Sequence, residues 1–213
     1  MPARRSPVDD SATRTALLDA AQELMLEEGY AAVTTRRLGA KAGLNNALVF
    51  YYFGTMDNLF IELFRRGAER SLERLKRALR SAQPLWALWE LTHDFSSNTL
   101  TMEFIALANH RKAIRSEIAA YSRRFRTLQL DMLSDVLDGY GVDRDRWPPV
   151  TLILFMTGIS RFLHIEEGFD LDVGHAETVA VIEREIRALE GDRLPPADAE
   201  AENEAETVAG GTD

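Results

Sequence analysis

Cysteine is absent from this 213-residue chain. Disulfides, thiolate metal ligands and a cysteine nucleophile are therefore excluded, and the composition suits a reducing compartment, so we expect a cytoplasmic protein. Long apolar runs are missing too. The longest, Val150 to Ile159, is interrupted by Thr151, Thr157 and Gly158 and is well short of the roughly 20 residues that span a bilayer. Because the polar N-terminus also lacks the apolar segment of a secretory signal, we expect neither export nor membrane insertion.

Positive charge is scarce overall, since 25 Lys and Arg residues accompany 34 Asp and Glu residues, for a formal net charge of -9. The excess is concentrated at the C-terminus. Eight acids and one base between Glu190 and Asp213 account for -7, which leaves -2 for residues 1–189. Local charge is therefore a better guide to the partner than the overall acidity. The Pro and Ala/Glu composition of residues 192–213 predicts a disordered acidic tail.

Alternating runs of β-branched residues are absent as well, whereas apolar residues recur at helical spacing almost everywhere, so the predicted fold class is all-α. We expect helices over about residues 13–28, 35–42, 45–53, 55–79, 84 to beyond 104, 110–115, 117–137, 148–165 and 174–190. Thr35 and Asn45 suit the N-cap positions of the second and third helices. Only Gly43 and Leu44 lie between these two helices, and such a tight turn is typical of a helix-turn-helix.

Several spaced elements of the first half resemble the N-terminal DNA-binding domain of the tetracycline-repressor (TetR) family. The resemblance covers about Thr13 to Phe64, and its elements are Ala20-Ala21-Gln22-Glu23-Leu24, Glu28-Gly29-Tyr30, Thr34-Thr35, Ala42-Gly43-Leu44-Asn45 and Tyr52-Phe53. It implies a three-helix, homeodomain-like DNA-binding domain followed by a C-terminal helical bundle. It further implies a homodimer that binds a palindromic operator, usually as a repressor, and that releases DNA when a small-molecule effector enters the bundle.

This resemblance divides the chain into four parts. Residues 1–12 are expected to form a flexible N-terminal arm, 13–54 the helix-turn-helix domain, 55–191 the ligand-binding and dimerisation domain, and 192–213 the acidic tail. The protein is expected to require no cofactor and to have no enzymatic activity. Its expected partners are operator DNA, an effector of unknown identity and a second copy of the chain.

The segment from Thr35 to Tyr52 contains three bases and no acid, which favours contact with DNA phosphates. Matching positions imply that Asn46 and Leu48 face the bases, where an Asn amide can pair with adenine and Leu can contact a thymine methyl. The alternative for Asn46 is a role in helix capping alone. The predicted DNA-binding residues are Thr35, Arg36, Arg37, Lys41, Asn45, Asn46, Ala47, Leu48, Phe50, Tyr51 and Thr55.

Three positions depart from the family pattern. Phe50 stands where many relatives have a phosphate-binding tyrosine, Met56 where a lysine is usual, and Asn46 where a basic or small polar residue is usual. The lost contacts are compensated by the Arg4-Arg5 arm, Arg14 and Tyr51, or the operator is bound with less dependence on salt.

The second half offers large apolar side chains for an effector cavity, which favours a hydrophobic or aromatic ligand, although core packing explains each of them equally well. The predicted ligand-binding residues are Trp86, Trp89, His93, Phe104, Tyr121, Phe125, Met132 and Phe155. The helix from Pro148 to Ile165 is apolar on almost every side, so it is expected to pair with the last helix in an intersubunit four-helix bundle. The predicted dimer contacts are Leu152, Phe155, Ile159, Phe162, Val179, Ile182 and Ile186.

Two other functions remain open. Glu90 and His93 have the Glu-x-x-His spacing of carboxylate-bridged metal bundles, so the bundle of a helical enzyme or metal-binding protein is one alternative. A second such motif is missing, and we therefore assign no metal ligand. The other alternative is a DNA-binding dimer without an effector.

Overall fold

The structure, a computed structural model, describes residues 7–195, with the exception of the side chains of residues 7–9, 95 and 96. The predictions for the Arg4-Arg5 arm and for the tail from residue 196 lie outside the described residues. The last described residues are held in place: the Gln83 amide donates hydrogen bonds to the carbonyls of Glu190 and Asp192 and accepts one from the Leu194 N–H.

The predicted all-α fold is confirmed, and no strand occurs within the described part of the chain. The elements are α1 (Pro7–Glu28), the 3-10 turn η1 (Tyr30–Ala32), α2 (Thr35–Ala42), α3 (Ala47–Phe53), α4 (Met56–Ala78), α5 (Pro84–Thr92), α6 (Phe95–His110), α7 (Lys112–Gly139), α8 (Pro149–Glu167) and α9 (His175–Glu190). None of the helices between residues 7 and 195 combines the length and the apolarity needed to cross a membrane.

The helix boundaries differ from the sequence prediction in three places. The helix expected from residue 84 to beyond 104 is broken after Thr92, because the Asp94 carboxylate accepts a hydrogen bond from the Ser97 N–H and caps a new helix. The helices expected at 110–115 and 117–137 form one continuous α7. α1 begins at Pro7 rather than residue 13, and its early turns are anchored where the Tyr52 hydroxyl donates to Asp10.

Buried apolar side chains form two separate cores. The first joins α1, α2 and α3 to the beginning of α4 and to α6, around Leu17, Leu38, Leu63 and Leu107. The second joins the end of α4 to α5, α7, α8 and α9, around Leu75, Leu88, Leu133 and Ile153. α4 contributes to both cores and connects the two ends of the molecule.

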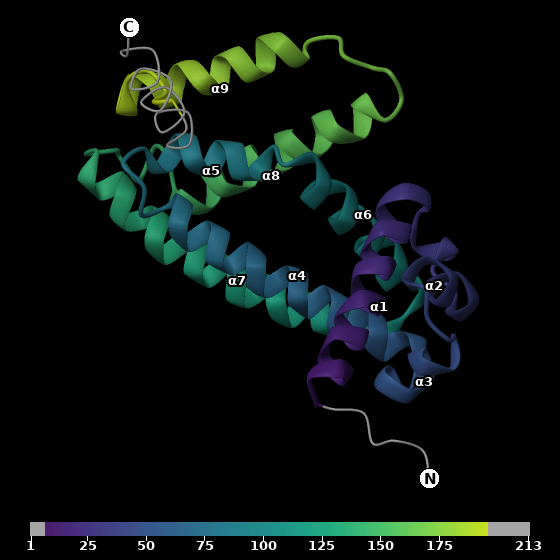
Figure 1. The fold of residues 1–213 in the computed structure, drawn as a ribbon. Coiled ribbons are helices and arrows are strands. Elements are labelled where there is room, and N and C mark those ends of the chain that lie inside the picture. The colour runs from purple at the N-terminus through teal and green to yellow at the C-terminus, as the bar shows by residue number, and fades with distance from the viewer. Residues whose placement is uncertain (1–6, 196–213) are drawn as a thin grey trace, which may run out of the picture.

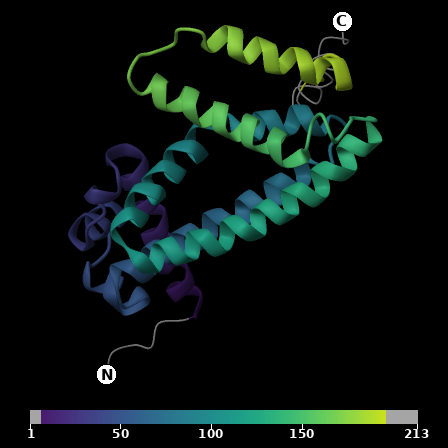
Figure 2. The ribbon, with the colours of Figure 1, turned by 180° about the vertical axis from the view of Figure 1, so that it is seen from behind.

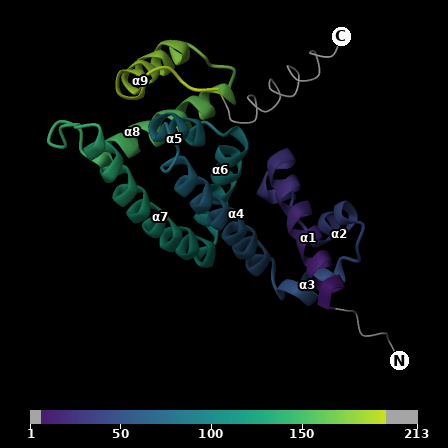
Figure 3. The same ribbon diagram turned by 60° about the vertical axis from the view of Figure 1, so that its left-hand side comes forward.

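The ribbon views show how these cores are arranged. α4 and α7 run side by side along the molecule, with α1, α2 and α3 at one end (Figure 1). From behind, α8 crosses the far end of α7, and α9 lies on the outer side of α8 (Figure 2). A third view separates the α1–α3 unit from the layer formed by α5, α8 and α9 (Figure 3). The molecule therefore has a small helical unit at one end and a larger bundle at the other.

Glu190, at the end of α9, links this helix to the start of α5 and to the residue after α7. Its carboxylate accepts hydrogen bonds from the backbone N–H groups of Leu85 and Trp86, in the first turn of α5, and from the Tyr140 hydroxyl. A carboxylate at a helix N-terminus satisfies N–H groups that have no partner within the helix. Burial, together with the hydrogen bond to Glu190, raises the pKa of Tyr140 to about 12.

Candidate DNA-binding and ligand-binding sites

The turn between α2 and α3 depends on two glycines. Gly43 ends α2 with φ of 66°, a left-handed conformation that residues with a side chain rarely adopt. At Gly39 the chain packs so closely that a Cβ atom would lie 2.8 Å from the Leu44 carbonyl oxygen and 3.0 Å from the Asn46 nitrogen. The sequence analysis did not identify Gly39. A glycine inside an otherwise helical segment was the signal available for it.

Helix caps fix the start of each short helix. Thr34, rather than the expected Thr35, caps α2, with its hydroxyl accepting from the Arg37 N–H at 3.4 Å. At α3 the N-cap position is Asn46 rather than the expected Asn45, and the Asn46 side chain makes no capping hydrogen bond. The Asn45 side-chain oxygen instead accepts from the Ala47 N–H at 2.9 Å. Thr55 caps α4 by accepting from the Asn58 N–H at 3.1 Å. Two predicted DNA-binding residues, Asn45 and Thr55, therefore also have a structural role.

α3 has one buried and one exposed face. Val49 and Phe53 pack into the first core, and Leu48 lies partly buried against it. Asn46 and Ala47 are exposed, and the exposed fractions of Phe50 and Tyr51 are 55% and 71%. Two large side chains that remain this accessible at the tip of a domain form a surface suited to a partner rather than a core.

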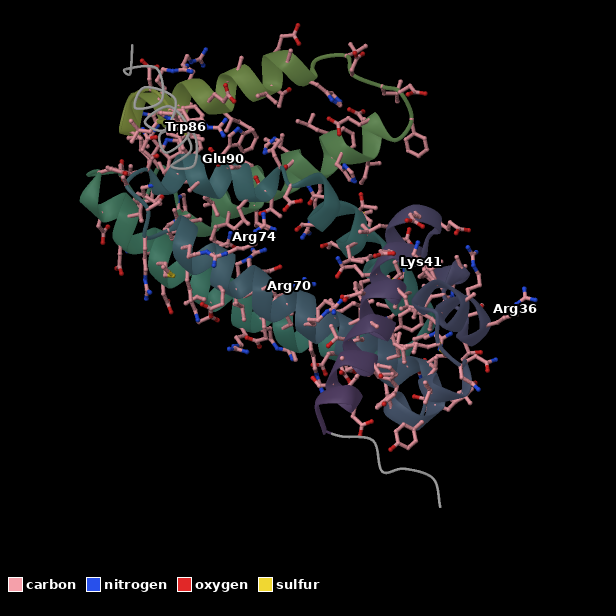
Figure 4. The ribbon with its side chains drawn as sticks, in the orientation of Figure 1. Arg36, Lys41, Arg70, Arg74, Trp86 and Glu90 are labelled. Atoms are coloured by element: carbon pink, nitrogen blue, oxygen red, sulfur yellow. The ribbon has the colours of Figure 1, made fainter. Side chains whose placement is uncertain are left out.

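The three bases of α2 have different surroundings. Arg37 is paired with Glu28, and the Lys41 ammonium lies 2.7 Å from Glu27 and 3.3 Å from Glu23, all on α1. The hydrogen bond with Glu27 raises the pKa of Lys41. Arg36 has no ion pair with any residue the structure describes, and it projects outward from this end of the molecule (Figure 4). A charge count within residues 35–52 missed the α1 acids because they lie earlier in the chain.

The other predicted contributors to DNA contact are also partly engaged. Arg14 lies 2.5 Å from Glu62 and over the Phe53 ring. Tyr52 packs edge-on against Tyr51, with ring centroids 4.9 Å apart. Arg36, Asn46, Ala47, Phe50 and Tyr51 are all exposed on the α2–α3 surface.

A hydrogen bond connects α6 to the α1–α3 unit directly. The Glu103 carboxylate accepts from the backbone N–H of Tyr30 at 2.6 Å, at the start of η1. Nearby on α6, Phe104 and Leu107 belong to the first core. A shift of α6 would therefore be transmitted to the connection between α1 and α2.

A cavity of about 500 Å³ lies between the two cores, which is within the usual size range of small-molecule sites. Side chains from α1, α4, α5, α6, α7 and α8 line it, including the predicted ligand-binding residues Phe104, Tyr121 and Phe125. With Phe64, these three form a chain of ring contacts at centroid distances of 5.3 to 5.5 Å. Burial raises the pKa of Tyr121 to about 12, so its hydroxyl stays protonated at neutral pH.

The other predicted ligand-binding residues lie elsewhere. Trp86 is buried, and its indole N–H donates to the Gly191 carbonyl. Trp89 is also buried, and its ring centroid lies 3.6 Å from that of His93. Met132 packs against the second core, and Phe155 is 53% exposed on α8. Their apolar character reflects packing or surface exposure, which a helical pattern alone does not distinguish from a cavity lining.

The sequence analysis missed the polar side of this cavity. Arg70, Arg74, Arg126 and Arg161 line it, against a single carboxylate, Asp94. Figure 4 shows Arg70 and Arg74 on α4, turned toward the space between α4 and the helices α5 and α6. Apolar periodicity predicts apolar cavity residues and does not indicate which arginines line a cavity.

Exposed apolar side chains gather on α8, where the exposed fractions of Leu154, Phe155 and Phe162 are between 53% and 58%, and on α9, where Val181 is 48% exposed. Ile159 is partly buried. By contrast Ile186 is buried in the second core, with Leu152, Val179 and Ile182 packed against it. Of these four predicted dimer contacts, Ile186 is therefore buried within this chain, and Leu152, Val179 and Ile182 remain partly exposed.

The Glu-x-x-His pair is occupied by other contacts. Glu90 forms an ion pair with Arg193 at 2.6 Å, and the His93 Nδ1 atom lies 2.9 Å from the Trp89 carbonyl. In the part of the chain that the structure describes, no three His, Asp or Glu side chains come together as metal ligands would.

Comparison with known proteins places this geometry in context. Residues 17–63 match the model described as "Bacterial regulatory proteins, tetR family". The HTH-type transcriptional repressor BepR of Brucella suis is 23% identical over 205 residues, which cover 87% of this chain and 97% of BepR.

Two solved structures are also similar. A transcriptional regulator from Rhodococcus sp. Rha1 superposes with a TM-score of 0.64 at 18% identity, over 85% of this chain and 99% of the other. A transcriptional regulator from Saccharomonospora viridis, solved in complex with choline, gives a TM-score of 0.64 at 20% identity, over 73% of this chain and 85% of the other. At these identities the likeness concerns the fold.

Proposed function

Because the chain belongs to the TetR family of bacterial transcriptional regulators, we propose that it is a repressor that binds a palindromic operator as a homodimer and is released by a small molecule. The name of its Brucella suis relative supports the repressor role. In this proposal residues 13–54 form the DNA-binding domain and 55–191 the ligand-binding and dimerisation domain.

The observation that carries the proposal is the exposed surface of α2 and α3. Arg36 is available for phosphate, and Asn46, Ala47, Phe50 and Tyr51 are exposed on a helix that enters a major groove in helix-turn-helix proteins. Asn46 can pair with both edges of an adenine, while the Phe50 and Tyr51 rings supply apolar surface for thymine methyl groups and the sugar. The proposed phosphate contacts are now centred on Arg36, because Arg37 and Lys41 are paired with α1.

Dimerisation is supported by the exposed apolar side chains of α8 and α9. Leu154, Phe155 and Phe162 repeat at the spacing of one helix face, and apolar faces of this kind are usually covered by a partner. We place the interface on these residues with Ile159 and Val181, and leave out Ile186, which is buried. The dimer has to hold two α3 helices about one DNA turn, roughly 34 to 36 Å, apart.

Effector control is supported by the cavity and by its neighbours. Gln22 and Leu26 of α1 line the same cavity as α6, and Glu103 of α6 holds Tyr30. A molecule that prefers one arrangement of α6 therefore shifts the position of α1 and α2 by as much as its affinity differs between the arrangements. Choline was bound to the similar Saccharomonospora viridis protein, and we do not extend that cation to this chain, whose cavity contains four arginines.

The test is fluorescence anisotropy with the DNA adjacent to the chain's own gene, at moderate salt and with an excess of unrelated duplex. The proposal expects saturable, sequence-specific binding by a dimer. Binding that the unrelated duplex abolishes, or a chain that sediments as a monomer at the binding concentration, would refute it. The alternative of a dimer without an effector is distinguished by thermal shift, because a true effector stabilises the form that binds it.

A further inference from the structure

The cavity between the two cores has an excess of positive charge that core packing does not require. Four guanidinium groups line it, and only Arg74 is balanced by a carboxylate, that of Asp94 at 2.6 Å. Arg70 donates to the neutral Gln22 side chain at 2.9 Å, so its charge persists. Neither Arg126 nor Arg161 has an ion pair or hydrogen bond with any residue the structure describes. Arg74 and Arg126 are partly buried and Arg70 and Arg161 are exposed, so the cavity wall carries a net positive charge that an anion would balance.

Arg126 and Arg161 act on the same region of the cavity. Arg126 is on α7, and Arg161 lies one helical turn after Thr157 on the α8 face that lines the cavity. Burial, together with the charge of the nearby Arg126, lowers the pKa of Arg161, although part of its surface still meets solvent. Two like charges held close together repel, and a carboxylate between them removes that repulsion while accepting hydrogen bonds from both.

Gln129 adds an independent observation. Its side chain is only 4% exposed and lines the cavity one turn after Arg126, yet its amide makes no hydrogen bond with any residue that the structure describes. The amide is therefore available to a molecule in the cavity. An amide N–H facing the same space as two guanidinium groups completes a set of donors for an oxygen-rich anion.

Along α7 the lining becomes more apolar with distance from Arg126 and Gln129, although Gln22 and Arg70 also line the cavity. The cavity-lining residues of α7 change from Ile118 and Tyr121 to Arg126 and Gln129 over eleven residues, which is about 16 Å of helix. The Phe64 ring contacts both the Phe104 ring and the Tyr121 ring, at centroid distances of 5.3 and 5.4 Å. The shape and lining fit a molecule with one charged head and an extended apolar body.

We propose that the effector is an amphipathic carboxylic acid, with its carboxylate bound by Arg126, Gln129 and Arg161 and its apolar body against Phe64, Phe104, Tyr121 and Phe125. This inference rests on the proposed function and defines the chemistry of its ligand. The inference excludes quaternary ammonium compounds. The carboxylate in the lining, that of Asp94, is already paired with Arg74, and the remaining arginines repel a cation.

The experiment is calorimetric titration of the full-length chain, without DNA, with molecules that share a body and differ in the head group. Decanoate, 1-decanol and decyltrimethylammonium form an aliphatic set, and 2-naphthoate, 2-naphthalenemethanol and 2-naphthylmethylammonium an aromatic set. We expect saturable binding of at least one acid, at least tenfold tighter than binding of its alcohol, and no binding of its cation. If neither acid binds, or if an alcohol or cation binds as tightly as its acid, the inference is wrong.

Variants locate the binding site. Arg126→Met and Arg161→Met keep the length of the side chain and remove its charge, and each should weaken binding of the acid by about tenfold or more, as charge-assisted hydrogen bonds do. Arg161→Lys should recover part of the loss. Arg123→Met, on an exposed position of α7, is the matched control and should bind like wild type. Equal affinity of all these variants would place the acid elsewhere and overturn the assignment.

The outcomes for the two proposals can be separated. Sedimentation of each variant shows whether it remains as dimeric as wild type, which matters for Arg161 because it neighbours Phe162. Specific DNA binding without acid binding refutes only the effector class. If the chain binds the acid but does not bind the DNA adjacent to its gene specifically, the proposed function is refuted and the ligand site is supported.

Discussion

Arg36, Arg37 and Lys41 lie on one short helix but have different neighbours, and this difference decides what each is free to contact. Arg37 and Lys41 are held by the acids of α1, whereas Arg36 projects into solvent without an ion pair among the described residues. Exposed ion pairs contribute little to stability, so their main effect here is to reduce the positive charge offered to DNA.

Arg36→Ala should weaken binding to all duplexes and reduce the magnitude of the salt slope by about two per dimer, since each copy loses one phosphate contact. Arg37→Ala should reduce it less, because Glu28 already neutralises that guanidinium. Anisotropy titrations over a range of salt concentrations measure both slopes. Equal slopes for the two variants would show that the Arg37 ion pair opens on DNA.

Asn46→Ala should relax the preference at one base position of each half-site, with a loss of about 1 to 3 kcal/mol of discrimination there. Binding-site selection from a randomised duplex measures this preference. Asn45→Ala is the matched control: the Asn45 side chain accepts a hydrogen bond from the first N–H of α3, so its loss should lower the melting temperature and leave the base preference unchanged. If selection returns the same site for Asn46→Ala and wild type, Asn46 is not a base-reading residue.

Gly39→Ala should destabilise the fold by about 1 to 3 kcal/mol, because the added methyl group meets the backbone of Leu44 and Asn46 and forces the two helices apart. Gly67→Ala on α4, where a Cβ atom meets nothing within 4 Å, is the control and should be neutral or slightly stabilising. Urea unfolding compares the two. A Gly39→Ala chain as stable as wild type would mean that the turn adjusts at little cost.

Among the elements, the helices with a strong apolar stripe were predictable, and their ends were less so. The α2–α3 turn followed from Gly43, Leu44 and Asn45, because turn chemistry is local. The break before α6 was missed although Asp94 and Ser97 have capping spacing, because the apolar pattern continues across it. The sequence predicted two helices where α7 is one, because polar residues around Ser116 interrupt the apolar pattern while the helix continues.

The cavity shows a different limit of sequence reasoning. Phe104, Tyr121 and Phe125 were predicted because large apolar residues on a bundle helix face inward. The position of Arg126 and Arg161 at the cavity wall depends on how α7 and α8 cross, and no local pattern encodes that crossing. Charged residues are normally assigned to the surface, so an inward arginine is recognised only once the packing is known.

Asp94→Ala should lower the free energy of unfolding by about 1 kcal/mol through loss of the α6 cap. Burial alone would raise the pKa of Asp94, but hydrogen bonds from Ser97 and the Arg74 ion pair outweigh it and hold this pKa below its ordinary value. The stability from this carboxylate is therefore present above about pH 4 and lost as the pH falls through the lower folded value.

Unfolding of wild type and Asp94→Ala across the acid range checks this prediction, since the difference between them should shrink below about pH 4. Asp131→Ala, at an exposed position on α7, is the control and should show little difference at any pH. A difference that grows toward low pH would contradict the sign of the pKa shift.

At the scale of the whole molecule, the exposed face of α8 determines whether two DNA-binding ends can be held together. Leu154, Phe155 and Phe162 leave an exposed apolar surface on α8. A second copy that covers this surface also sets the distance between the two α3 helices.

Phe162→Glu should weaken dimerisation at least about thirtyfold, roughly 2 kcal/mol, by placing a charge at the centre of the proposed interface. Operator affinity should fall with it, while the helical content stays unchanged. Thr127→Glu, an exposed change on α7, controls for the added charge. Sedimentation and anisotropy measure both effects, and a Phe162→Glu chain that remains dimeric would move the interface away from α8.

Gln22 and Leu26 of α1 form part of the cavity wall. The same helix therefore contributes both to the small-molecule site and to the DNA-binding domain. Thermodynamic linkage makes the two affinities reciprocal: an occupant that lowers the affinity for DNA by some factor is itself held more weakly on DNA by that same factor. The concentration at which such a regulator responds is therefore a property of the promoter as well as of the protein, and a tighter operator makes the same chain a less sensitive detector.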